Sequence, residues 1–405
     1  MRAYERFLTY ARVTTESADG TGVTPSTPCQ WDLAKKLEEE LRALGVEDVK
    51  TSPYCVVTGV LPATPGCEKA PALGFIAHVD TAPAFSGKNV EPILHENYDG
   101  EDIVLPKEGR VIRVADFPEL KGLKGRTVIT ADGSTLLGAD DKAGVAEIMT
   151  LCEELIQKKI PHGRISVAFT PDEEIGEGPD HFDVPGFGAE FAYTVDGGAE
   201  GGIEYENFNA ASATVEITGV SVHPGSAKGI MENAVLIAME LNAKLPPKEI
   251  PGCTDGYEGF FHLDIMEGDA AAMRMEYIIR DHDMEKFNAR KALMEKAAQE
   301  VAAAHPTAKV ELKLKDSYYN MVGQLKDCMH LVENAKEAAH MAGVEPETLP
   351  IRGGTDGARL SFMGLPCPNL GTGGYNYHGP YEFATVEGMD AVVEILKNIV
   401  ELYRK

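Results

Sequence analysis

The chain has 405 residues, of which 43% are hydrophobic and 25% are charged. Its formal net charge is −26, so its surface repels phosphate backbones and nucleic acid is not expected as a partner. No stretch approaches the roughly 20 uninterrupted apolar residues that cross a bilayer. The first residues also lack the continuous apolar core of a signal peptide. The composition predicts a soluble protein without membrane or nucleic-acid partners.

The seven cysteines are an odd number, and no two of them form a C-x-x-C pair. This usage indicates reduced thiols and a cytoplasmic location, and argues against a disulfide framework or a cysteine zinc site. The length favours two domains over a single core.

The first half of the chain has the pattern of an α/β sheet. A helix is expected with Thr27 as its N-cap, Pro28 at the first helical position and an end at Gly45. A second helix follows Asp141, where apolar residues recur at helical spacing. Apolar runs separated by helical stretches predict strands buried on both faces of a sheet. These runs cover residues 54–61, 73–79, 165–169 and 191–195.

The pattern changes between about Asn209 and Asp316, where four segments alternate with period two. With two helical stretches among them, the order is β-α-β-β-α-β, the split ferredoxin-like motif. After Asn320 the chain returns to helix and short strand. We therefore predict a compact domain at 209–319, inserted into a larger α/β domain formed by 1–208 and 320–405.

Several predicted strands end in residues that can bind metals. His78 and Asp80 follow the strand at 73–79, and the period of two puts them on one side. A metal-binding histidine usually donates its other ring nitrogen to a carboxylate or carbonyl, a role that Asp80 could fill. A structural core histidine is the alternative. Asp140 and Asp141 lie where a strand end turns into a helix, a place where the macrodipole alone also favours acids.

Two adjacent glutamates, Glu173 and Glu174, directly follow the strand at 165–169. Both cannot easily bind one ion, so one can ligate while the other accepts a proton. A solvated acidic loop is the alternative. Asp196 ends another apolar strand, and His378 lies in a glycine-rich loop.

Together these strand ends predict a metal site. Open α/β sheets bind ligands at the carboxyl ends of their strands, where these side chains gather. Two imidazoles and several carboxylates suit divalent cations, and one carboxylate could bridge two ions.

At this point the whole chain resembles the M20 family of dinuclear zinc metallopeptidases, and within it the tripeptide aminopeptidases. The resemblance implies a mixed-sheet zinc-exopeptidase catalytic domain with an inserted ferredoxin-like α+β lid that also serves dimerisation. The motifs that carry it are HVDTAP at 78–83, FSGKNV at 85–90, GADDKAG at 138–144, TPDEEIG at 170–176, VDGG at 195–198 and YNYHG at 375–379.

The resemblance also implies roles for the metal-binding residues. His78 and Asp196 would bind one zinc ion, while Glu174 and His378 would bind the other. Asp140 would bridge the two ions. Zinc is the default because histidine is mixed with carboxylate, and Co²⁺ or Mn²⁺ would also fit these ligands.

Two catalytic roles follow from the same resemblance. Glu173 would be the general base, and Asp80 would support His78. The family also has a cis peptide bond after the bridging aspartate, here between Asp140 and Asp141.

Three residues are expected to bind substrate by resemblance. His223 resembles a lid histidine, Arg280 would bind the terminal carboxylate of a peptide, and Arg352 begins a loop that resembles a substrate-binding loop. A solvated surface side chain is the alternative for each of them.

The expected function is removal of the N-terminal residue from tripeptides, with a small peptide as the partner and a homodimer formed through the lid. The first alternative is an M20 deacylase acting on N-acyl amino acids or dipeptides. The second is a metal- or peptide-binding protein without turnover. The presence of Glu173 argues against the second alternative, because binding alone needs no base beside the metals.

Overall fold

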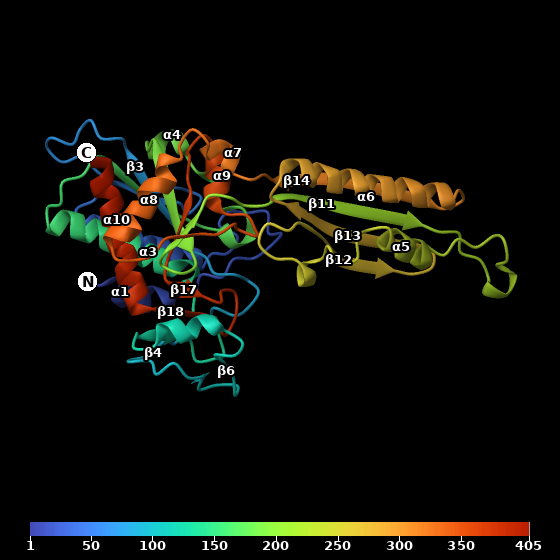
Figure 1. The fold of residues 1–405 in the computed structure, drawn as a ribbon, viewed down its shortest axis with the longest axis horizontal. Helices are drawn as coiled ribbons and strands as arrows, with labels where there is room; N and C mark the ends of the chain where they lie inside the picture. Colours follow the sequence, from blue (N-terminus) through green and yellow to red (C-terminus); the bar gives the residue numbers. More distant parts are fainter. Residues whose placement is uncertain (405) are drawn as a thin grey trace. The chain divides into compact units, whose positions relative to one another are not determined.

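The computed structural model describes residues 1–404, which form two compact units (Figure 1). The smaller unit consists of Glu206–Val322 and Pro350–Gly354, and the larger unit contains the other described residues. The range 320–405, which the sequence assigns to the larger domain, is thus interrupted at Pro350–Gly354. A main-chain hydrogen bond of 2.8 Å from Ile351 N to Glu206 O helps to tie this segment to the smaller unit.

An eight-stranded sheet forms the centre of the larger unit. Its inner strands β8, β3, β9 and β16 run parallel, whereas β2 and β10 run antiparallel to their inner neighbours, so the predicted mixed sheet is confirmed. The order across the sheet is β1 (Glu47–Thr51), β2 (Val57–Leu61), β8 (Ile165–Thr170), β3 (Leu73–His78), β9 (Phe191–Gly197), β16 (Asn369–Gly371), β10 (Gly202–Glu204) and β15 (Glu347–Thr348).

The helices of the larger unit pack against this sheet and against one another (Figure 1). They are α1 (Ala3–Ala11), α2 (Gln30–Leu44), α3 (Ala139–Gln157), α4 (Val184–Phe187), α8 (His330–Met341), α9 (Asp356–Phe362) and α10 (Val386–Arg404). A short helix, α7 (Val322–Leu325), lies at the boundary between the units.

Both faces of the sheet are covered, as β3 demonstrates. A side chain at Gly74 would overlap the ring of Phe187 in α4. The next residue, Phe75, stacks on Tyr193 of β9, whose hydroxyl donates to the carbonyl of Leu331 in α8 at 2.8 Å. Successive residues of a strand point to opposite faces, so α4 and α8 cover different sides. This arrangement explains why every residue of β3 is buried.

Helix α2 begins later than the sequence predicts. Its first residue is Gln30, and Cys29 occupies the N-cap position. The hydroxyl of Thr27 donates to the carbonyl of Glu16 at 2.6 Å, so it does not cap the helix. The predicted end is confirmed, because Gly45 has the left-handed conformation, with φ of 89°, that commonly terminates helices.

Smaller elements complete the larger unit. A four-stranded sheet has the order β17 (Gly374–Tyr375), β18 (Phe383–Thr385), β7 (Val128–Thr130) and β4 (Ile93–His95). A hairpin joins β5 (Ile103–Val104) and β6 (Val111–Ile112). Short 3₁₀ turns occur at η1 (Pro118–Leu123), η2 (Glu173–Ile175) and η3 (Gly178–His181).

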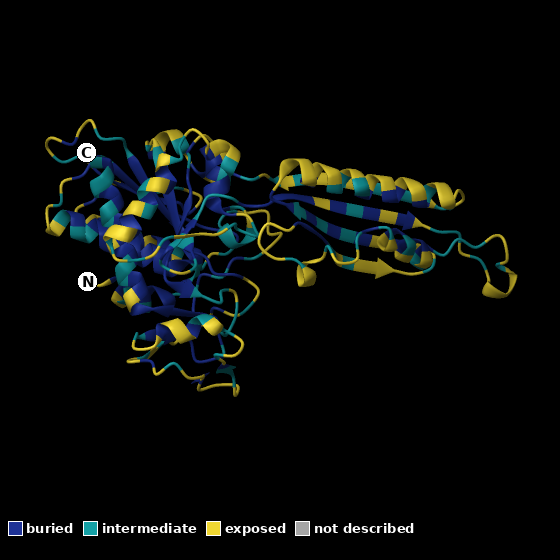
Figure 2. Ribbon diagram, viewed as in Figure 1, coloured by how far each residue is buried: buried dark blue, intermediate teal, exposed yellow. Residues whose placement is uncertain are grey.

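The smaller unit has the predicted β-α-β-β-α-β order. Its strands pair in the spatial order β12-β13-β11-β14, all antiparallel, which confirms the ferredoxin-like topology. Burial alternates along β13, as Figure 2 shows, because one sheet face packs on the two helices. The elements are β11 (Asn209–Thr218), α5 (Ala234–Ala243), β12 (Phe260–Gly268), β13 (Ala272–Asp281), α6 (Met284–Ala304) and β14 (Lys309–Tyr318), with 3₁₀ turns at η4 (Pro224–Ser226) and η5 (Pro251–Cys253).

Within residues 1–404, none of the helices combines the length and the apolar character required to span a membrane.

Candidate metal centre

The carboxylate of Asp140 lies between two histidines. Its Oδ1 is 2.9 Å from Nε2 of His78, and its Oδ2 is 3.0 Å from Nε2 of His378. His78 ends β3, Asp140 lies at the start of α3, and His378 belongs to the loop after β17. Three segments that are far apart in the sequence therefore converge on one carboxylate, each oxygen of which faces a different imidazole.

Each histidine also contacts a second carboxylate. Nε2 of His78 is 3.2 Å from Oδ1 of Asp196 at the end of β9, and Nε2 of His378 is 2.9 Å from Oε2 of Glu174 in η2. The structure thus brings together all five residues that the sequence predicts as metal ligands. They form two pairs of one histidine and one carboxylate, with Asp140 between the pairs.

Asp80 connects the first histidine to the loop of the two glutamates. Nδ1 of His78 is 3.1 Å from the main-chain oxygen of Asp80 and 3.3 Å from its Oδ1. The same carboxylate accepts hydrogen bonds from the main-chain amides of Glu173 at 3.0 Å and Glu174 at 3.2 Å. Asp80 is fully buried, so this contact can fix the ring of His78 and the position of both glutamates.

The carboxylate of Glu173 is different from its neighbours. Among residues 1–404 it has no hydrogen bond or ion pair, and only its main chain is bonded. Burial and the charge of Asp196 raise its pKa well above the ordinary value. Glu173 is therefore available to exchange a proton with a molecule in the site.

The centre holds more negative charge than its own groups can balance. Burial raises the pKa of Glu174 to about 7 and that of Asp196 to about 8. Hydrogen bonds to Asp140 and Glu174 raise the pKa of His378 to about 11. Within the described chain, Oε1 of Glu174 is buried without a hydrogen-bond partner. Buried carboxylates that cannot all ionise, beside two imidazoles, fit a site for divalent cations.

Atom separations agree with this fit. Ligand atoms of His78, Asp140 and Glu174 lie within 4.8 Å of one another, and so do those of His78, Asp141 and Asp196. Both sets contain His78, so the centre groups oxygen and nitrogen donors closely enough to hold a divalent cation.

Asp141 is a buried acid of the centre that the sequence interpretation did not select. Its Oδ2 accepts from the amide of His78 at 3.1 Å, and its Oδ1 accepts from the amide of Gly144 at 3.2 Å. The peptide bond between Asp140 and Asp141 is cis, as the family resemblance implies. The only sequence signal was the pair of adjacent acids, which does not distinguish a cap from a residue of the site.

Glycine at position 144 allows α3 to approach the sheet at this point. A side chain there would overlap the carbonyl oxygen of Val195, the residue before Asp196. The close contact brings the start of α3 to the carboxyl end of β9.

The three predicted substrate-binding residues all belong to the smaller unit. His223 caps the turn η4, with its Nδ1 accepting from Gly225 N at 3.1 Å. Arg280 lies in β13 and donates to the carbonyl of Arg352 at 2.8 Å. Its Nε is buried without a partner among residues 1–404. The two arginines therefore lie together, and within the described residues His223 has no hydrogen bond to either.

The guanidinium of Arg352 is engaged within the smaller unit. It donates to the carbonyls of Gly256 at 2.7 Å and Glu258 at 3.1 Å, and to both oxygens of Thr254 at 3.0 and 3.3 Å. These contacts hold the loop before β12.

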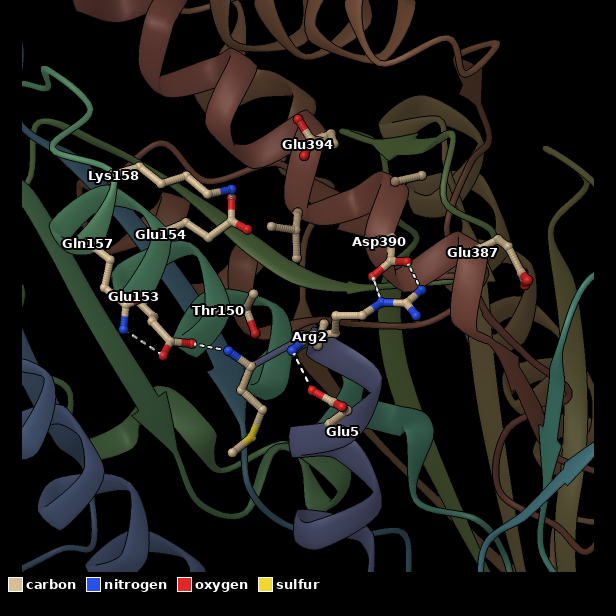
Figure 3. Close-up of a pocket in the computed structure, with 14 residues that line it drawn as sticks. Arg2, Glu5, Thr150, Glu153, Glu154, Gln157, Lys158, Glu387, Asp390 and Glu394 are labelled. Atoms are coloured by element: carbon tan, nitrogen blue, oxygen red, sulfur yellow. Dashed lines mark hydrogen bonds and ion pairs between the residues drawn. The ribbon is translucent and has the colours of Figure 1, made fainter.

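A separate cavity of about 720 Å³ lies among α1, α3 and α10 (Figure 3). Three of its acidic groups have cationic partners: the N-terminal ammonium is 2.7 Å from Glu153, Lys158 is 2.8 Å from Glu154, and Arg2 contacts Asp390. None of the predicted site residues lines this cavity. It is therefore distinct from the metal centre.

A family model described as Peptidase family M20/M25/M40 matches residues 131–402. The chain belongs to this peptidase family. The membership confirms the resemblance that the motifs indicate, and this M20 peptidase is a hydrolase acting on peptide bonds.

Relatives match the M20 peptidase over almost its whole length. Peptidase T of Escherichia fergusonii is 52% identical over 99% of this chain and 98% of that protein. Peptidase T of Geobacillus kaustophilus is 51% identical over the same shares. The solved structure of aminopeptidase PepT from Bacillus cereus superposes with a TM-score of 0.79 at 24% identity, covering 100% of this chain and 98% of that one. The similarity to this solved structure shows that the two chains share the same fold.

Proposed function

We propose that this M20 peptidase is an aminopeptidase that releases the N-terminal residue from tripeptides. The observation that carries the proposal is the position of Asp140, whose two oxygens face His78 and His378 while the carboxylate of Glu173 stays unbonded nearby. Full-length similarity to proteins named Peptidase T, which the sequence resemblance associates with tripeptides, supports the choice of substrate.

The proposed ligands divide into two sets that share one residue. His78 and Asp196 would hold one cation, Glu174 and His378 the other, and Asp140 would contact both. Two divalent cations would supply Lewis acidity for the scissile carbonyl and would lower the pKa of the attacking water. Zinc suits the mixture of imidazole and carboxylate, and Co²⁺ and Mn²⁺ suit it as well.

Glu173 would act as the general base. Its carboxylate takes a proton from the attacking water and then delivers that proton to the nitrogen of the leaving amine. Asp80 supports this role, because it accepts the hydrogen bond of the Glu173 amide and so fixes the start of the side chain. The same contact leaves the Glu173 carboxylate itself unrestrained for proton transfer.

Residues of the smaller unit would recognise the substrate. Arg280 has a buried Nε without a partner among residues 1–404, and its guanidinium would bind the terminal carboxylate of the peptide. His223 would stabilise the charge on the tetrahedral oxygen. Arg352 would contribute to substrate binding by holding the loop before β12 in place. A homodimer formed through this unit and a cytoplasmic location stay predictions.

The test is hydrolysis of a tripeptide, its dipeptide and tetrapeptide relatives, and the N-acetylated tripeptide, each with and without a chelator. We expect rapid cleavage of the free tripeptide, loss of activity on chelation, and recovery when Zn²⁺, Co²⁺ or Mn²⁺ is added. Preferential cleavage of the acetylated compound would instead identify a deacylase. Full activity of a metal-free preparation would refute the metal chemistry.

A further inference from the structure

A carboxylate outside the proposed ligand set binds the loop that carries Asp140. Oε2 of Glu382 accepts hydrogen bonds from the main-chain amides of Leu137 at 2.7 Å and Gly138 at 2.8 Å. Its Oε1 accepts from the amide of Asp140 at 3.1 Å. Glu382 is 1% exposed, so all three hydrogen bonds are shielded from water.

These amides need an acceptor because the helix is irregular where it begins. Gly138 has a left-handed conformation with φ of 77°, and Asp140 and Asp141 have non-helical dihedral angles. The first amides of a helix lack partners within the helix, and a buried amide without a partner is destabilising. Successive amides that point into one concavity form an anion-binding nest, which the Glu382 side chain fills.

Glu382 also belongs to the segment that carries the second histidine. It lies in the same loop as His378, and its own amide donates to the carbonyl of Gly379 at 3.3 Å. Strand β18 begins at the next residue and pairs with β7 and β17, so the backbone at Glu382 is held by a sheet. One side chain therefore fastens the loop of Asp140 to the loop of His378.

We propose that Glu382 is a positioning residue that holds the Asp140 carboxylate between the two histidines. This inference rests on the proposed function, in which Asp140 contacts both cations. A carboxylate is required because each oxygen must accept from an amide. In Glu382→Gln one acceptor becomes an NH₂ group that faces another N–H, and in Glu382→Asp the carboxylate falls short of the amides.

Glu147 provides a matched control. It is a second fully buried glutamate of the larger unit and lies in α3, the helix that begins beside Asp140. Neither of its oxygens has a hydrogen-bond partner among residues 1–404. Glu147→Gln therefore changes a buried carboxyl group of the same helix into an amide without removing a hydrogen bond.

The experiment is titration of the metal-free full-length protein with Co²⁺, followed by calorimetry and by visible absorption. Circular dichroism and thermal melting show that each variant is folded. Loss of a partner that orients a ligand typically weakens metal affinity by about 10–100-fold. We expect this loss and an altered Co²⁺ spectrum in E382Q, a smaller loss in E382D, and the Co²⁺ affinity and spectrum of the wild type in E147Q. For a tripeptide, kcat falls in E382Q and KM changes little.

Wild-type affinity and an unchanged spectrum in a folded E382Q would overturn the proposal. If E382Q does not fold, the Co²⁺ affinity and spectrum of E382D are used in the same way, because its side chain keeps the carboxylate and is only too short to contact the amides. An equal loss in E147Q would also overturn it, since the effect would then follow from any change of a buried carboxyl group to an amide in the larger unit. The titration needs no substrate. If the wild type binds cations but cleaves no tripeptide, the proposed function fails while the role of Glu382 is still decided by the titration.

Discussion

His78 and Asp80 contact each other at two points: Nδ1 of the imidazole lies 3.1 Å from the main-chain oxygen and 3.3 Å from the carboxylate of Asp80. Both partners are acceptors, so Nδ1 carries the hydrogen and donates it. The other ring nitrogen, Nε2, faces the carboxylates of Asp140 and Asp196, and its lone pair would be the one that a cation held by these carboxylates receives. A neutral imidazole in this tautomer is the form that binds a metal.

Substitution of Asp80 tests this relationship. The two carboxylate oxygens of Asp80 accept hydrogen bonds from the amides of Glu173 and Glu174, one each. Asp80→Asn replaces one of these oxygens with an NH₂ group, so one of the two amides loses its acceptor. We expect affinity for Zn²⁺ and kcat to fall by about 10–100-fold. Calorimetric titration and tripeptide hydrolysis measure the two effects. The control is Asp116→Asn, an exposed aspartate beside Arg113, which should behave as wild type.

Substitution of Glu173 tests the general base. We expect Glu173→Gln to lower kcat by about 10²–10⁴-fold, because proton transfer to a positioned side chain contributes a factor of this size. Metal content should not change, since the side chain makes no hydrogen bond or ion pair among residues 1–404. Glu177→Gln, four residues further along the same segment, is the matched control. Wild-type kcat in E173Q would exclude Glu173 as the base.

Substitution of Arg280 tests recognition of the peptide carboxylate. A hydrogen bond to a charged group contributes about 1.5–3 kcal/mol, so we expect Arg280→Met to raise KM by roughly 10–100-fold. The increase should disappear when the substrate is a tripeptide amide, which has no terminal carboxylate. An equal increase for the acid and the amide would contradict carboxylate recognition.

Substitution of Arg352 should act mainly on stability. Its guanidinium donates to main-chain oxygens at Thr254, Gly256 and Glu258. We expect Arg352→Met to leave these carbonyls unpaired and to destabilise the protein by about 1–3 kcal/mol, measured by urea unfolding. An unchanged unfolding curve with a raised KM would show instead that Arg352 acts on the substrate alone.

Glu147 predicts a pH-dependent stability. Burial, with smaller effects of Glu200 and Asp390, raises its pKa well above the ordinary value. The ordinary pKa applies to the unfolded chain and the raised pKa to the folded protein. At a pH between the two, the unfolded chain binds fewer protons than the folded one, so the free energy of unfolding falls as pH rises. Glu147→Gln removes this loss. We expect E147Q to exceed the wild type by about 1–3 kcal/mol near pH 8, and the difference to shrink toward pH 4. Urea unfolding at both pH values measures it, and a constant difference would contradict the assignment.

Local patterns predicted much of the fold because they report on local physics. Alternation between Asn209 and Asp316 identified the four strands of the ferredoxin-like sheet, since period two follows from the pleat. Gly45 marked a helix end because it adopts a conformation that other residues avoid. Thr27 misled the prediction for the opposite reason: its hydroxyl found a tertiary partner, the carbonyl of Glu16, which no local pattern shows.

The site was predictable where a residue follows a buried strand and less so elsewhere. His78 and Asp196 stand at strand ends, so the topology of an α/β sheet placed them. Glu382 was not noticed and Asp141 was not selected as a site residue, because the role of each depends on partners distant in sequence. The amide of Asp140 is the partner of Glu382, and the amide of His78 is the partner of Asp141. The segment Pro350–Gly354 likewise joins the smaller unit through tertiary contacts, which include hydrogen bonds and the position of Arg352 over the ring of Phe208.

The residues around the metal centre come from segments spread between His78 and Glu382. A ribosome adding about 5–20 residues per second therefore needs tens of seconds between the first and the last of them. During that interval β3 can pair with its neighbours, but the loop of His378 does not yet exist. With the proposed ligands, hydrolytic capacity arises only after His378 has been added, so a growing chain that has not reached this residue cannot act on the peptides around it.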